Sequence, residues 1–150
     1  MADKVKMLRP VSGSTSTSPD MPQKQVIADY TTLSNATGLA VDRSQNVYVS
    51  DYARHVVLKY RLGTNDSPQV IAGAYDQAGL VDGQGTTARF TNPGAIAIDP
   101  SGVVYVVDVG NSRIRRISEN GVVTTLAATT AVAGDPIAVD NSGNIFIVES

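Results

Sequence analysis

The sequence predicts an all-β protein built from repeated four-stranded antiparallel units. Short apolar or alternating runs are separated by turn-forming residues along most of the chain, and one arrangement of such runs occurs three times. In each copy a first strand ends at an aspartate, and a second acidic residue follows nine positions later. The pairs are Asp42 and Asp51, Asp99 and Asp108, and Asp140 and Glu149. A register shared by three copies indicates stacked repeats of one supersecondary unit.

The start of the chain differs from these repeats. Residues 1–22 are rich in Ser, Thr, Pro and Lys and are expected to form a polar arm, whereas residues 23–150 are expected to form the repeat domain. Two short stretches, residues 4–8 and 24–28, have the composition of single strands. We therefore expect two N-terminal strands before the first copy.

The central copy, residues 88–126, shows the unit most clearly. Its first turn is Asp-Pro-Ser-Gly, in which Asp99 bonds backbone amides ahead of it and Gly102 adopts a positive φ without steric cost. Four strands so close in sequence form a meander, and aliphatic residues on both of its faces require packing between similar sheets. The expected strands are residues 95–99, 103–108, 113–117 and 122–126.

The flanking copies follow the same plan with two departures. The first, residues 38–60, gains its fourth strand from residues 69–72, and the third, residues 136–150, has first and second strands only. The first copy also has Arg-Ser-Gln where the others have a glycine turn, so Gln45 or Asn46 is expected to adopt left-handed geometry. The segment between the first two copies is residues 61–93, and its Gly-rich part, after the strand at residues 69–72, is expected to form a long crossing loop.

Composition limits the classes of function. The chain of 150 residues has no cysteine, which excludes disulfides, thiolate catalysis and zinc–thiolate sites. Its formal net charge of −2 predicts no general attraction to nucleic acid or anionic membranes. No run approaches the roughly 20 apolar residues of a membrane helix, and no signal sequence is apparent. We expect a soluble, untargeted protein of the cytoplasm or of a virion.

Several motifs together resemble those of the NHL-repeat β-propellers. They are the lead-in AG…DGQGTTARF at residues 72–90, followed by PGAIAID, VYVVD and NSRIRRI, and the match is closest over residues 71–127. The resemblance implies a β-propeller of four-stranded antiparallel blades, about three per chain. The register of the three copies then predicts innermost strands near residues 37–42, 94–98 and 136–140.

Ring closure is expected to require two copies of the chain. Three blades are too few for twisted sheets to close, whereas two chains give six, within the usual four to eight. The expected homodimer forms by strand exchange, in which residues 4–8 and 24–28 of one chain complete the blade begun by the C-terminal strands of the other. The expected partner is therefore the chain itself, with other proteins of a large assembly as further partners.

The recurring acidic residues are interpreted as structural. A ring of carboxylates that binds a cation is the alternative, but a turn aspartate that bonds local amides explains the spacing without a ligand. The expected structural turn residues are Asp42, Asp51, Asp99, Gly102, Asp108, Asp140 and Gly143. Neither a metal nor another cofactor is expected.

A basic set is the candidate for binding an anion or a partner. Strand alternation places Arg113 and Arg115 on one side of a strand with Arg116 opposite, and an RNA- or phosphate-binding module is the function that such a set would serve. The negative net charge favours a solvated role instead, so nucleic acid is not an expected partner. The set comprises Arg54, Lys59, Arg61, Arg113, Arg115 and Arg116.

No catalytic constellation is expected from these residues. His55 is the single histidine, is expected at a solvated turn or strand edge, and has no cysteine or second histidine to act with. We therefore expect a non-catalytic structural or interaction module, such as a phage virion decoration protein or another assembly subunit. The alternative is a small-ligand or calcium-dependent enzyme like the sugar-lactonase propellers. That alternative needs polar residues on the innermost strands, which are apolar here.

Overall fold

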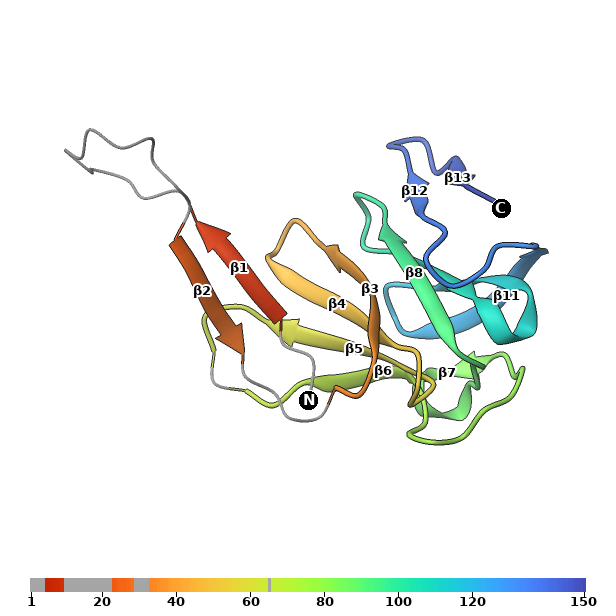
Figure 1. The fold of residues 1–150 in the computed structure, drawn as a ribbon, viewed down its shortest axis with the longest axis horizontal. Helices are drawn as coiled ribbons and strands as arrows, with labels where there is room; N and C mark the ends of the chain where they lie inside the picture. Colours follow the sequence, from red (N-terminus) through yellow and green to blue (C-terminus); the bar gives the residue numbers. More distant parts are fainter. Residues whose placement is uncertain (1–4, 10–22, 29–32, 65) are drawn as a thin grey trace.

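The computed structural model describes residues 5–9, 23–28, 33–64 and 66–150, and these form an all-β structure. Four antiparallel sheets follow one another along the chain in a row (Figure 1). We call the first sheet the N-terminal hairpin and the next three blade 1, blade 2 and blade 3. The architecture is that of a β-propeller, as the sequence predicted.

The strands have the following bounds. The N-terminal hairpin is β1 (Val5–Arg9) with β2 (Gln23–Ala28), and blade 1 is β3 (Ala36–Val41), β4 (Asn46–Asp51), β5 (Val56–Arg61) and β6 (Gln69–Gly73). Blade 2 is β8 (Pro93–Ile98), β9 (Val104–Asp108), β10 (Arg113–Ile117) and β11 (Val122–Ala128), with the short strand β7 (Gly83–Gln84) beside β11. Blade 3 is β12 (Ile137–Val139) and β13 (Ile145–Ile147). The two 3₁₀ helices are η1 (Gly85–Thr87) and η2 (Val109–Asn111), and within the described ranges no helix is long and apolar enough to cross a membrane.

The predicted strands are confirmed with small shifts at their ends. The two N-terminal strands expected at residues 4–8 and 24–28 are β1 and β2, which pair antiparallel. The crossing loop contributes an unexpected strand, because β7 pairs with the outer edge of β11. Apart from β1, the expected polar arm of residues 1–22 lies outside the described residues.

The innermost strands of the three blades are β3, β8 and β12, and β8 contacts both of the others. β3 and β8 approach closely at Gly38, where a Cβ atom would collide with the carbonyl oxygen of Gly94. The hydroxyl of Thr37 donates to the carbonyl of Pro93 over 2.9 Å, and the hydroxyl of Ser50 donates to the carbonyl of Gly94 over 2.5 Å. Glycine at position 38 therefore allows two blades to share polar contacts at their innermost strands.

The hydrophobic core lies between the blades. Tyr48 and Val57 of blade 1 pack with Val104 and Val106 of blade 2 in one buried cluster, and Val107 belongs to another cluster shared with blade 3. Successive side chains of a strand point to opposite faces of the sheet, so β9 contributes to both clusters. Blade 2 is therefore packed on both faces, as aliphatic residues on both faces of the repeat require.

Candidate interaction surfaces

Every blade has two faces. We call the face that points toward the next blade along the chain the front face, and the opposite face the back face. In blade 1 the cross-strand pair Ala40 and Tyr48 belongs to the front face. It packs against Ile96 and Ile98 on the back face of blade 2. Tyr48 is 7% exposed and Ile96 is 6% exposed. This closed seam shows what covers a blade face in this fold.

Blade 3 carries the same kind of pair without a cover. Ala138 pairs with Phe146 across β12 and β13 as Ala40 pairs with Tyr48, but Phe146 is 59% exposed. Val148 follows on the same face and is 53% exposed. These side chains and their strand neighbours line an apolar pocket of about 180 Å³. We call Phe146 and Val148 the open front face.

Blade 1 has the matching exposed pair on the back face of its innermost strand β3, whereas Val47 and Val49 on the same face of β4 are buried. Leu39 and Val41 of β3 are 57% and 53% exposed, and we call them the open back face. Counted back from the turn aspartate, they occupy the positions that Ile96 and Ile98 occupy in blade 2. Phe146 and Leu39 are therefore exposed at positions whose equivalents, Tyr48 and Ile96, are buried between two blades.

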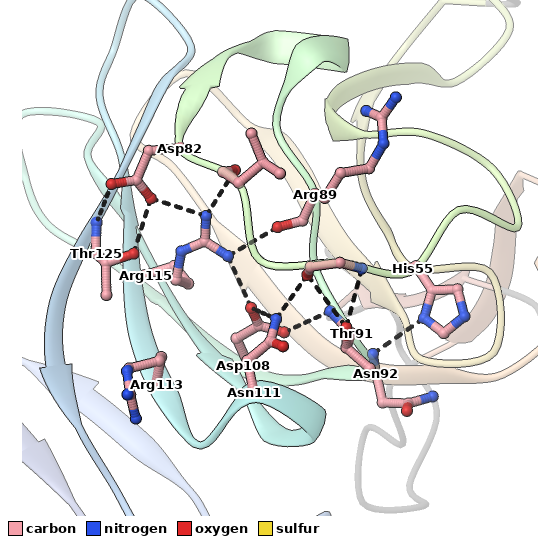
Figure 2. Close-up of polar contacts among 12 residues, drawn as sticks. His55, Asp82, Arg89, Thr91, Asn92, Asp108, Asn111, Arg113, Arg115 and Thr125 are labelled. Atoms are coloured by element: carbon pink, nitrogen blue, oxygen red, sulfur yellow. Dashed lines mark hydrogen bonds and ion pairs between the residues drawn. The ribbon is translucent and has the colours of Figure 1, made fainter.

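A buried arginine fixes blade 2 to the crossing loop that precedes it (Figure 2). Arg115 on β10 is 0% exposed, and its guanidinium donates to Asp108 Oδ2 over 2.8 Å and to Asp82 Oδ1 over 3.0 Å. The same group donates to the carbonyls of Arg89 and Val81 over 2.8 and 2.9 Å. The guanidinium is thus enclosed and already paired with two carboxylates. Its inclusion in the anion-binding set is therefore corrected.

Of the other basic residues of the predicted set, Lys59 and Arg61 line one pocket of about 200 Å³, which Asp66 also lines. Arg54 lies just before β5, and its guanidinium carbon is 4.0 Å from the centre of the Tyr75 ring. Arg61 is the last residue of β5. Arg113 points away from the buried network (Figure 2). Lys59 and Arg116 lie on different blades, each directly opposite a tyrosine on the neighbouring strand. The set is therefore spread over blades 1 and 2, and its binding of an anion or a partner stays a prediction.

The first group of turn aspartates shares one set of contacts. Oδ1 of Asp99 accepts the amides of Ser101 and Val103, and Asp42 and Asp140 accept the amides two and four residues ahead in the same way. Each turn contains one residue with a positive φ. These residues are Gln45, Gly102 and Gly143.

The second group, Asp51, Asp108 and Glu149, reaches further along the chain. Asp51 accepts the amide of Ser34 and Asp108 accepts the amide of Thr91, in both cases 17 residues earlier. Glu149 makes the equivalent bond in blade 3. Each carboxylate therefore ties the end of the second strand to the segment that enters the first strand of the same blade. The sequence predicted the local turn but not this long-range contact.

His55 connects blades 1 and 2. It lies in a turn with φ of 62°, as expected, but its Nδ1 accepts the backbone amide of Asn92 over 3.0 Å (Figure 2). The side-chain amide of Asn92 in turn donates to the carbonyl of Tyr52. The expectation of a solvated histidine is therefore wrong, because the ring accepts an interblade hydrogen bond and is half-buried.

A polar groove runs between blades 1 and 2 on the side of the Asp42 turn. Two adjoining pockets of about 430 and 380 Å³ share Tyr48, Lys59, Gly102 and Glu119. Burial and the negative charge of Asp42 raise the pKa of Tyr48 to about 12, so the phenol donates to Asp42 over 3.1 Å and is not a proton acceptor at neutral pH. Within the described ranges, no three His, Asp or Glu side chains come together to hold a metal ion.

Comparison with known proteins assigns these blades to a family. The sequence model of the teneurin NHL domain matches residues 39–150. The chain belongs to the teneurin NHL domain family. Among relatives of this NHL domain, Teneurin-1 of Gallus gallus is 32% identical over 71% of the chain, and Teneurin-4 of Mus musculus is 32% identical over 69%. The chain covers about 4% of the length of these teneurins.

Solved structures agree with the fold of the NHL domain. A chain in the structure of a nidogen/laminin complex matches with a TM-score of 0.70 at 19% identity, covering 97% of this chain and 49% of that one. A Bacteroides thetaiotaomicron protein of unknown function matches with a TM-score of 0.68 at 22% identity, covering 85% of this chain and 37% of that one. At these identities the likeness supports the propeller fold alone.

The turn aspartates of the NHL domain predict a loss of stability in acid. Burial acts to raise the pKa of Asp99, but hydrogen bonds from Ser101 and Val103 outweigh it and hold the pKa below its ordinary value of 3.8. A hydrogen bond from the side-chain amide of Asn144 likewise lowers the pKa of Asp140. Groups whose pKa is lower in the folded state stabilise the fold above their unfolded pKa, and this contribution is lost as the pH falls through the folded pKa.

We therefore expect the urea midpoint to fall as the pH is lowered below about 4. At neutral pH, Asp99→Asn is expected to lower the free energy of unfolding by about 1 kcal/mol, and this difference is expected to shrink as the carboxylate becomes protonated in the parent chain. Urea unfolding of the parent chain and of the Asp99→Asn variant, repeated from neutral pH into acid, measures this difference in the free energy of unfolding. A difference that stays constant with pH would contradict the role given to the Asp99 carboxylate.

Proposed function

We propose that this NHL domain is a non-catalytic protein-interaction module that binds through its open front and open back faces. The observation that carries the proposal is the exposure of Phe146 and Leu39 at positions whose equivalents, Tyr48 and Ile96, are buried against another blade. Contiguous apolar surface at such positions marks an interaction site when no other part of the chain covers it. A further protein surface is the cover that suits these faces.

The comparisons are consistent with a role in binding. One of the similar folds comes from the structure of a nidogen/laminin complex, in which protein is bound to protein. The narrower expectation of a phage virion subunit stays a prediction, because the similarity to teneurins and to the chain of the nidogen/laminin complex lends it no support. The whole activity of the teneurins is not transferred, because the chain spans about 4% of their length.

A small-ligand or calcium-dependent enzyme is the second candidate, and the groove between blades 1 and 2 favours it. A pocket of about 430 Å³ has the size of a ligand site. Its polar groups include Lys59 and Glu119, which could orient a small molecule. Tyr48, however, is held as a hydrogen-bond donor to Asp42. The groove therefore ranks below the open faces.

Selection of displayed random peptides on single copies of the chain, immobilised too sparsely to associate with one another, tests the proposal. We expect the selected peptides to bind the Phe146→Asp or Leu39→Lys variant at least about tenfold more weakly, because a charge on either face opposes apolar docking. The same peptides are expected to bind the groove variant Lys59→Ala unchanged. Peptides that depend on Lys59 and on neither face would contradict the proposal.

An activity assay separates the second candidate. Turnover of a lactone or a phosphoester that is lost in Lys59→Ala or Glu119→Gln would identify the groove as a catalytic site. A rise in the melting temperature on addition of calcium ions would indicate a cation site. We expect neither result, and either one would favour the enzyme.

A further inference from the structure

We propose that the partner at these two faces is a second copy of this chain. The open front face of one copy docks on the open back face of the other, and the β1–β2 hairpin of the second copy pairs with the free edge of β13 in the first. The result is a composite blade with the strand order β12, β13, β1, β2. The inference rests on the proposed function, because it uses the same two faces.

The two open faces are the two halves of a seam that the chain already contains. The closed seam between blades 1 and 2 joins an alanine–aromatic pair on a front face to two aliphatic side chains on a back face. The open front face offers Phe146 beside Ala138, and the open back face offers Leu39 and Val41. Another seam of this pattern therefore needs no new type of contact.

The strand β13 has one edge that no described strand covers, because its described partner is β12. The backbone groups of Asn144 and Val148 bond toward β12. Bonded and non-bonded pairs alternate in an antiparallel ladder, so the N–H and C=O groups of Ile145 and Ile147 point to the free edge. In blade 2 the equivalent strand β9 uses this edge to pair with β10. The free edge of β13 is thus ready to accept a third strand.

The β1–β2 hairpin has the chain position of third and fourth strands of a blade. In blade 2 the third and fourth strands, β10 and β11, stand directly before β12, the innermost strand of the next blade. The hairpin stands before β3 in the same way, and its connection, residues 29–35, is nearly as long as residues 129–136 between β11 and β12. Leu33 in this connection is buried like Phe90, its equivalent before β8.

A second copy satisfies both open ends at once. Within one chain the hairpin and β13 lie at opposite ends of the row of sheets (Figure 1). Two copies related by a two-fold axis each give their hairpin to the other, which forms two identical composite blades. Blades 1 and 2 of each copy and the two composite blades make six, within the four to eight blades of propellers.

Light scattering on the full chain tests the inference. We expect a particle of twice the 15.7 kDa chain mass at micromolar concentration. Phe146→Asp or Leu39→Lys is expected to weaken the dimer about a hundredfold, because each variant breaks both seams at a cost of roughly tenfold per seam. Equimolar mixing of the two variants is expected to restore association, because the mixed dimer has one unaltered seam and one seam with opposite charges.

Leu80→Asp is the matched control, because Leu80 is 46% exposed in the loop between blades 1 and 2 and belongs to neither face. It is expected to leave the mass unchanged. Val148→Asp and Val41→Lys repeat the test on the same faces if circular dichroism shows that a first variant does not fold. A parent chain that is monomeric, or a dimer that only one face affects, would overturn the inference. Peptides that still select the two faces on such a chain would leave the proposed function standing.

Discussion

Arg115→Ala is expected to lower the free energy of unfolding by about 3–5 kcal/mol, measured by urea unfolding at neutral pH. The substitution leaves the buried carboxylate of Asp108 without its cation. It also removes the guanidinium that lies 4.8 Å from the centre of the Phe90 ring, and with it the two bonds to carbonyls of the crossing loop. The effect is large because the desolvation of the carboxylate is then uncompensated.

The pH dependence of this variant gives a second readout. Burial raises the pKa of Asp108, against hydrogen bonds from Asn111, Thr91 and Arg115 that lower it. Loss of the arginine is expected to raise the folded pKa further, so protonation favours the folded variant and its deficit is expected to shrink as the pH falls. Arg113→Ala is the matched control on the same strand, with an expected change within about 0.5 kcal/mol. A loss below about 1 kcal/mol for Arg115→Ala would contradict the structural role of this ion pair.

Deleting residues 1–28 is expected to abolish the dimer and to leave a chain that aggregates. The deletion removes β1 and β2 from both composite blades, and each ladder bond lost contributes about 0.5–1.5 kcal/mol. The uncovered edge of β13 and the exposed Phe146 then present a template for irregular pairing. Light scattering and the fraction of protein left in solution after centrifugation measure both effects.

The control for this deletion keeps the hairpin strands. Scrambling residues 13–19, which lie between β1 and β2 in the sequence, leaves the strand residues unchanged and is expected to leave the dimer intact. A dimer that survives the deletion of residues 1–28 would exclude strand exchange by the hairpin. It would not by itself exclude docking of the two open faces.

The strands and turns of this protein could be predicted because local chemistry specifies them. Four consecutive residues specify the Asp99 turn, and its amide contacts recur at Asp42 and Asp140. Strand β7 could not be predicted, because its Gly-Gln pair has no strand character and pairs with β11 only through tertiary structure. Local signals therefore sufficed for the blades and failed where a loop is recruited to an edge.

The buried arginine shows why the polar site was harder to predict. Arg115 lies in a strand with two other arginines, which on its own indicates a solvated edge. Its partner Asp82 lies 33 residues earlier on the crossing loop, so no local pattern joins them. One signal was present in the sequence, because the equivalent position of the first copy is an apolar residue, Leu58, which indicates a position that faces the core. In the structure Leu58 is 0% exposed.

The open faces could not be predicted from residue type. Phe146 and Tyr105 occupy equivalent positions, yet Phe146 is 59% exposed and Tyr105 is 7% exposed. The difference depends on whether another sheet lies over the position, which only the arrangement of blades reveals. His55 was misjudged for the same reason, because its partner Asn92 belongs to the next blade.

Amide hydrogen exchange at the free edge of β13 tests the composite blade most directly. In the dimer, the amides of Ile145 and Ile147 bond to β1 of the other copy, so we expect them to exchange at least about a hundredfold more slowly than in the monomeric Phe146→Asp variant. The amides of Val104 and Val106, which face β10 within one chain, are expected to be slow in both. Exchange at Ile145 and Ile147 that is equally fast in the parent chain and the variant would contradict the exchange of strands between two copies.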